Sequence, residues 1–210
     1  RRVLFRSSQT LDGNLAIIRV FSDRNPGTFY LFDKAKKQAR HLVHSRPWVD
    51  PNESATVEPV EFTARDGMTI RGYLTVPNGK EAKNLPLVVN PHGGPHGPRD
   101  WWGYNPEAQF LASRGIAVLQ VNFRGSGGYG RDFEHAGYKK WGSEIQYDII
   151  DGTRHLIDKG IADEKRICIY GGSFGGYSAL QSPILEPDLF ACAIGFVGVY
   201  DLQLLYEEGD

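Results

Sequence analysis

Residues 167–177 read Ile-Cys-Ile-Tyr-Gly-Gly-Ser-Phe-Gly-Gly-Tyr, and this stretch decides the fold. A short apolar run ends in the pattern Gly-x-Ser-x-Gly, with Ser173 at its centre. Small residues on both sides permit a sharp turn that lifts the serine clear of its own backbone. The segment 177–181 suits a helix, whose free amides and dipole favour a developing negative charge beside the serine. The stretch therefore predicts a strand, a turn and a helix, with Ser173 as a nucleophile.

The glycine content of the chain limits what this pattern proves alone. There are 25 glycines among 210 residues, so a Gly-x-Ser-x-Gly match counts only with its strand and helix around it. A glycine-rich turn with an incidental serine is the alternative interpretation. Both flanking elements are predicted here, which favours the nucleophile.

The composition is that of a globular protein able to bury a core, with 40% hydrophobic and 23% charged residues. The net charge of -1 lacks the positive excess that attracts nucleic acid or an anionic membrane, so neither partner is indicated. No apolar stretch approaches the roughly eighteen residues of a membrane-spanning helix. Cys168 and Cys192 both fall in predicted strands, where core packing is expected rather than a disulfide framework.

The first seven residues, Arg-Arg-Val-Leu-Phe-Arg-Ser, are also what the sequencing-library adapter CGACGTGTGCTCTTCCGATCT encodes. We expect residues 1–7 to be an assembly scar outside the fold. The chain is then expected to be a fragment, with a break at either end.

Residues 14–44 are predicted to be an antiparallel meander of about three strands, with turn residues at 23–27 and 33–37. Three strands alone are marginally stable, so neighbouring strands are expected. Residues 51–59 have the proline-rich composition of a linker. A hairpin follows, with Asp66-Gly67 at its bend.

From residue 85 the pattern alternates between strands and helices, which predicts a mostly parallel sheet. Asn105 and Pro106 form a helix start, and residues 143–146 fit a capping box for a second helix. Its apolar positions keep helical spacing on one face. Strands are expected at 85–90, 116–123, 166–170 and 191–197.

A second glycine pair follows directly on the first of these strands. Residues 92–95 read His-Gly-Gly-Pro, and paired glycines let a backbone approach a substrate oxyanion closely. Acyl transfer needs such a second amide donor opposite the one after the serine. A tight strand-exit turn is the alternative. His92 and His96 have the spacing of zinc ligands, but Gly-Gly-Pro between them forbids the helix that would align them, so no metal site is expected.

Residues 125–130 satisfy Gly-x-Gly-x-x-Gly after a strand, which is typical of dinucleotide binding. The segment after it is a poor helix start, and no acid stands at the tip of the next strand. A flexible surface loop near the site rim is the preferred interpretation. Arg124 and Tyr129 are weak candidates for substrate binding, and Arg124 pairing with an acid is the favoured alternative.

The residues that should activate Ser173 are not found after it. A hydrolase triad of this kind runs serine, acid, histidine, yet all six histidines precede Ser173. Asp201 is a weak candidate for the relay acid. Pro183 falls where the helix after Ser173 should continue and is expected to kink it or end it early.

Together these motifs resemble the prolyl oligopeptidase family of serine peptidases, in its acylaminoacyl-peptidase and dipeptidyl-peptidase branch. The resemblance implies an incomplete α/β-hydrolase domain over 60–210 with its C-terminal strands missing, preceded by the end of a β-propeller over 8–50. It implies Ser173 as nucleophile, with the amides of Phe174 and Gly94 as the oxyanion hole. It also implies that the propeller restricts access to peptide or acyl-peptide substrates. The motifs that carry it are 62–67 with 72–74, 92–96, 122–126 with 128–130, and 171–177.

The favoured function is peptide-bond hydrolysis through an acyl-enzyme at Ser173, in a parent protein of which this chain is an inactive fragment. A carboxylesterase-type hydrolase and a non-catalytic binding module on the same scaffold are the alternatives. No cofactor is expected, and a homo-oligomer is left open. The compartment is also left open, with the cytoplasm slightly favoured over the periplasm.

Overall fold

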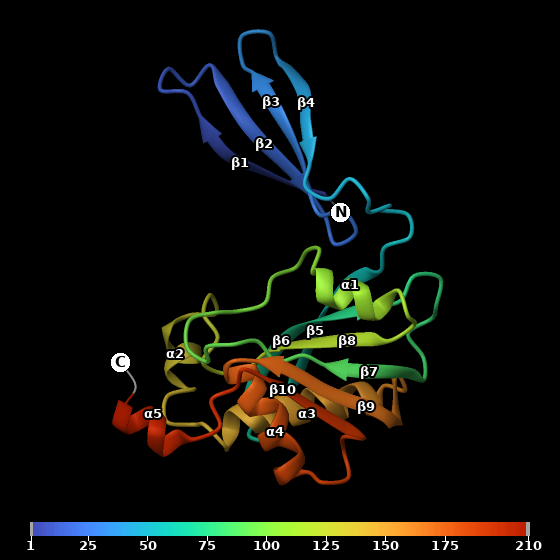
Figure 1. The fold of residues 1–210 in the computed structure, drawn as a ribbon, viewed down its shortest axis with the longest axis vertical. Helices are drawn as coiled ribbons and strands as arrows, with labels where there is room; N and C mark the ends of the chain where they lie inside the picture. The colour runs from blue at the N-terminus through green and yellow to red at the C-terminus, as the bar shows by residue number, and fades with distance from the viewer. Residues whose placement is uncertain (1, 209–210) are drawn as a thin grey trace.

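The computed structural model describes residues 2–208, so Arg1, Gly209 and Asp210 lie outside the described residues. Within that range the strands form two separate sheets, one of four strands and one of six (Figure 1). The first, the N-terminal sheet, is antiparallel in the order β1-β2-β3-β4. Its strands are β1 (Val3–Gln9), β2 (Leu15–Phe21), β3 (Thr28–Asp33) and β4 (Gln38–His44).

The three strands expected over 14–44 are confirmed as β2, β3 and β4, and β1 is a fourth strand that precedes them. Strand β1 covers residues that the sequence analysis set aside as an adapter scar, and it pairs with β2 from Val3 opposite Phe21 onward. The β-prone side chains Val3, Leu4 and Phe5 suit a strand whatever their origin. That origin, and the domain boundaries drawn from it, stay predictions.

The second sheet, the main sheet, has the order β10-β9-β7-β8-β6-β5. Strands β7 to β10 run parallel, and the β5–β6 hairpin joins them antiparallel through β8. The predicted strand–helix alternation is therefore confirmed. The bounds are β5 (Thr56–Thr63), β6 (Thr69–Val76), β7 (Leu85–Val89), β8 (Ala117–Asn122), β9 (Ala162–Gly172) and β10 (Cys192–Phe196).

Strand β5 begins at Thr56, inside the segment 51–59 that was predicted to be a linker between domains. Proline composition suggested irregular chain up to Pro59, yet Pro59 lies in the strand opposite Tyr73. Strand β5 is the last in the sheet order, and proline, which has no amide hydrogen to donate, is tolerated on such an edge.

The helices cover both faces of the main sheet. Helix α1 packs on β6 and β8, while α3 and α4 pack on the opposite face (Figure 1). The core between these layers is apolar, with Ile70, Leu119 and Ile167 fully buried. The helix bounds are α1 (Pro106–Ala112), α2 (Arg131–His135), α3 (Glu144–Asp158), α4 (Phe174–Leu185) and α5 (Leu202–Glu208).

The helix starts were predicted with mixed success. Asn105 caps α1 as expected, since its side chain accepts from the amides of Glu107 and Ala108. At α3 the capping box is wrong: Ser143 makes no side-chain capping bond, and Gln146 Oε1 accepts from Gly142 N instead, at 2.6 Å. The Gln146 side chain thus binds the residue before the cap instead of the amide of Ser143 itself.

Pro183 does not end α4 early, because the helix continues to Leu185. The proline lies in the last turn, so only the end of the helix is affected. The prediction of an early end is therefore wrong.

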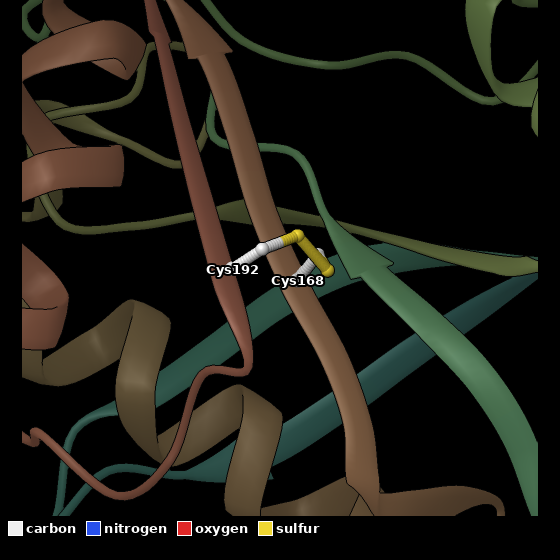
Figure 2. Close-up of a disulfide and its surroundings, with 2 residues drawn as sticks. All are labelled: Cys168 and Cys192. Atoms are coloured by element: carbon white, nitrogen blue, oxygen red, sulfur yellow. A yellow bond between two sulfur atoms is a disulfide. The ribbon is translucent and has the colours of Figure 1, made fainter.

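The reading of the two cysteines as separate core residues is also wrong. Cys168 of β9 and Cys192 of β10 form a disulfide (Figure 2). The two residues stand opposite each other in the parallel register, with Cα atoms 4.7 Å apart. Sequence alone gave no register between these strands, so the pairing was missed.

The two sheets are joined by a small polar contact. Gln109 of α1 accepts from Ala55 N and donates to the carbonyl oxygens of Ala55 and Asp23. Asp23 in turn accepts from Val57 N at 3.0 Å. Because Gln109 is buried, these bonds fix the turn after β2 against α1 and β5.

None of the helices within residues 2–208 is both long enough and apolar enough to cross a membrane.

Candidate active site

Ser173 stands at the crossing from β9 to α4, at the carboxyl edge of the main sheet. Its backbone has φ of 56° and ψ of −125°, a conformation that residues with a side chain rarely adopt. Its amide donates to Phe196 O of β10 at 3.0 Å, and its carbonyl accepts from the amides of Gly176 and Tyr177. The side chain is exposed, so the turn presents the hydroxyl to solvent as the sequence predicted.

The close crossing explains why both flanking positions are glycine. A Cβ on Gly171 would collide with the backbone of Gly175, and a Cβ on Gly175 would collide with Pro91 O. At Gly172, by contrast, a Cβ would lie 3.6 Å from the Phe196 ring, an ordinary contact. The Gly-x-Ser-x-Gly pattern is thus a packing requirement at its two outer positions.

The loop after β7 lies beside this turn, because β7 and β9 are neighbours in the sheet. A Cβ on Gly93 would be 3.5 Å from Ser173 Cβ and 3.8 Å from Ser173 Oγ. Asn90 Nδ2 donates to Tyr170 O at 2.8 Å and ties the two strand ends together. Gly94 follows in the same loop, and Phe174 is the first residue of α4. Their roles as amide donors to an oxyanion stay predictions.

His92 opens this loop, but both of its ring nitrogens are occupied. Nδ1 lies 2.7 Å from Gly93 O, which can only accept, so Nδ1 carries the hydrogen. Nε2 is then the acceptor for the hydroxyl of Ser126, at 2.8 Å. The ring stacks on Phe123 at 4.2 Å, and burial lowers its pKa from 6.5 to about 4. His92 is therefore a neutral structural residue and not a base for Ser173.

His96 takes a different place in the loop. Its ring meets Tyr138 edge-on at 4.7 Å, and burial lowers its pKa. Across the described residues, no group of three or more His, Cys, Asp or Glu side chains is placed to hold a metal ion.

The buried Arg124 side chain pairs with two acids, and a role for it in substrate binding stays a prediction. Its Nε and Nη2 donate to Asp148, and its Nη1 donates to Asp66 at 2.6 Å. Burial lowers the pKa of Arg124, but these hydrogen bonds outweigh it and raise the pKa above its usual value. The alternative of an acid partner is the one observed.

The prediction of a flexible surface loop at 125–130 is wrong for its first half, since Gly125, Ser126 and Gly127 are buried. Tyr129 is half-buried, and its hydroxyl accepts from Asn122 Nδ2 at 2.8 Å. Its ring lines an open cleft of about 380 Å³ with Tyr73, Arg71 and Arg99. A role for Tyr129 in substrate binding stays a prediction.

Two of the acids after Ser173 have partners away from the serine. Asp201, the weak candidate for the relay acid, accepts from Leu204 N at 2.9 Å and caps α5. Glu186 pairs with Arg154 at 2.7 Å. Within residues 2–208 the site therefore has an exposed serine beside a glycine-containing loop.

The sequence reasoning missed one part of the site and one buried acid elsewhere. Phe196 O anchors the Ser173 amide, and only the parallel pairing of β10 with β9 reveals it. The buried acid is Asp100: burial raises its pKa to about 7, and its Oδ1 accepts from Gln120 at 2.7 Å. An acid among tryptophan and arginine residues at 99–102 was the available signal.

Comparison with known proteins gives a consistent result. The sequence profile of the prolyl oligopeptidase family matches residues 102–210, more than half of the chain. Dipeptidyl aminopeptidase BIII from Pseudoxanthomonas mexicana is 36% identical over 206 residues, covering 95% of this chain and 30% of that protein. The chain spans about 30% of the length of the curated relatives it matches first.

Two solved structures are similar over almost the whole chain. A puromycin-hydrolysing peptidase of Mycobacterium tuberculosis has a TM-score of 0.81 and 29% identity, covering 93% of this chain and 31% of that one. An acylaminoacyl peptidase of Pyrococcus horikoshii has a TM-score of 0.79 and 27% identity, covering 97% and 33%. These matches confirm the predicted fold class, part of an α/β-hydrolase domain preceded by the last part of a β-propeller.

Replacing glycines in the turn tests the packing explanation. Gly175→Ala should lower the free energy of unfolding by about 3 kcal/mol or more, although alanine favours a helix by about 1 kcal/mol. Gly172→Ala, the matched control one residue before Ser173, should change it by less than about 1 kcal/mol. Urea unfolding followed by circular dichroism measures both. Equal stability of the two variants would contradict the observed crossing.

The lowered pKa of His92 predicts a pH dependence of stability. Between pH 6.5 and about 4 the unfolded chain binds a proton at His92 while the folded chain does not. The contribution of His92 to the free energy of unfolding therefore falls as the pH is lowered through that window. The loss is about 2 kcal/mol, because the ring keeps some access to solvent. Unfolding free energies at pH 7 and pH 4 should differ less in His92→Gln than in the wild type. The same pH difference in both proteins would refute the assignment.

Proposed function

Because the chain belongs to the prolyl oligopeptidase family, we propose that it is part of a serine peptidase that cleaves peptide bonds through an acyl-enzyme at Ser173. The observation that carries this proposal is the strained turn that exposes the Ser173 hydroxyl beside the 92–95 loop. A side chain held clear of its backbone at a helix start is suited to nucleophilic attack.

The chemistry of the proposal follows from this placement. Ser173 Oγ attacks the scissile carbonyl carbon and transfers its proton to a base, which then protonates the leaving amine as the C–N bond breaks. The amides of Phe174 and Gly94 donate to the oxygen that becomes negatively charged. Water then attacks the resulting ester and releases the acyl group.

The base and its relay acid are proposed to come from parts of the protein outside these 210 residues. Support comes from the six histidines, all of which precede Ser173, and from His92, whose nitrogens are both engaged. The chain also spans only 30% of relatives such as dipeptidyl aminopeptidase BIII. By this proposal the chain alone is inactive or nearly so, since a serine without its base retains little of the rate.

The proposed substrate class is a short peptide or acyl-peptide. The names of the relatives support it: they include a dipeptidyl aminopeptidase, acylamino-acid-releasing enzymes and a puromycin-hydrolysing peptidase. The N-terminal sheet supports it too, because a propeller of which it is part would admit only small substrates to the site. The sheet argues against a carboxylesterase-type hydrolase, because most such enzymes need no propeller.

Activity assays test the proposal on two proteins, this chain and a longer protein that continues into an acid and a histidine. The longer protein should hydrolyse peptide anilides, and Ser173→Ala should lower its kcat by about 10⁴-fold or more. The 210-residue chain should show no turnover above the Ser173→Ala background.

Three outcomes would contradict parts of this account. Robust turnover by the 210-residue chain would show that the base lies within it. Ester hydrolysis without anilide hydrolysis by the longer protein would favour the carboxylesterase. Binding of peptides with no hydrolysis by either protein would favour a non-catalytic binding module.

A further inference from the structure

The disulfide lies on the strand pair that carries the nucleophile turn. Cys168 is five residues before Ser173 in the chain, on β9, and Cys192 stands opposite it on β10 (Figure 2). The parallel register continues without a shift from that pair to Gly172 opposite Phe196. The next bond is the one from Ser173 N to Phe196 O. One continuous ladder therefore connects the covalent bond to the turn.

The end of β10 also sets the space available to the first turn of α4. A Cβ on Gly176 would lie 2.9 Å from Phe196 O and 3.0 Å from Gly198 Cα. The backbone after Ser173 therefore packs directly on the backbone of β10. Any displacement of β10 would move both the acceptor for the Ser173 amide and the surface beneath α4.

Among the described residues, β10 is held by its ladder with β9 and by its packing on α4. It is the terminal strand in the order of the main sheet, and its contacts are with β9 and α4. Ile194 and Phe196 are 55% and 59% exposed, and Gly195 has no side chain to bury. The covalent bond adds a constraint to this ladder, directly between β10 and the strand that leads to Ser173.

We propose that the Cys168–Cys192 disulfide is a positioning element for the nucleophile turn. In the oxidised protein it fixes β10 against β9, and β10 then holds Ser173 in its strained conformation. In the reduced protein β10 separates from β9 more often, and the turn loses the Phe196 carbonyl. The proposal rests on the proposed function only in calling Ser173 a nucleophile.

Forming the bond requires an oxidant. The two thiols lose two protons and two electrons, and a small disulfide such as oxidised glutathione accepts them. One cysteine thiolate attacks it and releases one reduced glutathione, and the second cysteine attacks the resulting mixed disulfide and releases the other. Such bonds persist in oxidising compartments and are rare in the cytosol. The proposal therefore favours the periplasm or an extracellular location over the cytoplasm, the reverse of the slight preference taken from the sequence.

Hydrogen exchange of the 210-residue chain tests the proposal without requiring activity. The chain is refolded with oxidised glutathione, and a peptide map without reductant establishes the Cys168–Cys192 linkage. Exchange is then compared between the oxidised chain and the chain reduced with a phosphine. Reduction should speed exchange by about tenfold in 171–177 and 192–198, and by less than about twofold in 117–122 of the central strand β8.

A variant without the two cysteines repeats the comparison without a reductant, in case reduction unfolds the chain. Cys168→Val with Cys192→Ala restores apolar volume without the bond, and its exchange should resemble that of the reduced chain in the same two segments. Unlinked cysteines after oxidative refolding, or unchanged exchange at 171–177 on reduction, would overturn the proposal. Equal acceleration in all three segments of both proteins would also overturn it, by showing a global effect. Failure of the peptidase assay alone would leave these results unaffected.

Discussion

The backbone of Ser173 at φ 56° is the constraint on which the rest of the site depends. A residue with a side chain in such a conformation costs about 1–3 kcal/mol and persists only where its surroundings enforce it. Here the surroundings are two glycines that allow β9 and α4 to cross, and the Phe196 carbonyl that accepts from the Ser173 amide. Each of these features would be unnecessary if the serine did not have to stand clear of the chain.

The parallel sheet brings distant residues to this point. The 92–95 loop and Ser173 are about eighty positions apart, yet β7 and β9 are adjacent, so both strands deliver their following loops to one edge. The buried layer beneath them, which includes Leu87, Ile169 and Phe174, holds these strand ends rigid. The strain at the turn is small beside the apolar burial that supports it.

Local sequence signals predicted the parts of the fold that depend on neighbours in the chain. The turn at Ser173, the cap at Asn105 and the hairpin at Asp66-Gly67 each need only a few adjacent residues, and each was found. The Arg124–Asp148 pair was predicted only as an alternative, and the Cys168–Cys192 bond was missed. Both depend on which element packs beside which, and no pattern within one strand or helix encodes that.

The most direct test of this account compares the unfolding free energies of Ser173→Gly and Ser173→Ala. At an ordinary position glycine is less stable than alanine by about 0.5–1 kcal/mol, because it loses more backbone entropy on folding. At a strained positive φ the order reverses, so the account predicts that Ser173→Gly is the more stable variant by about 1 kcal/mol. A less stable Ser173→Gly would show that the turn is not held in the conformation on which the proposed site depends.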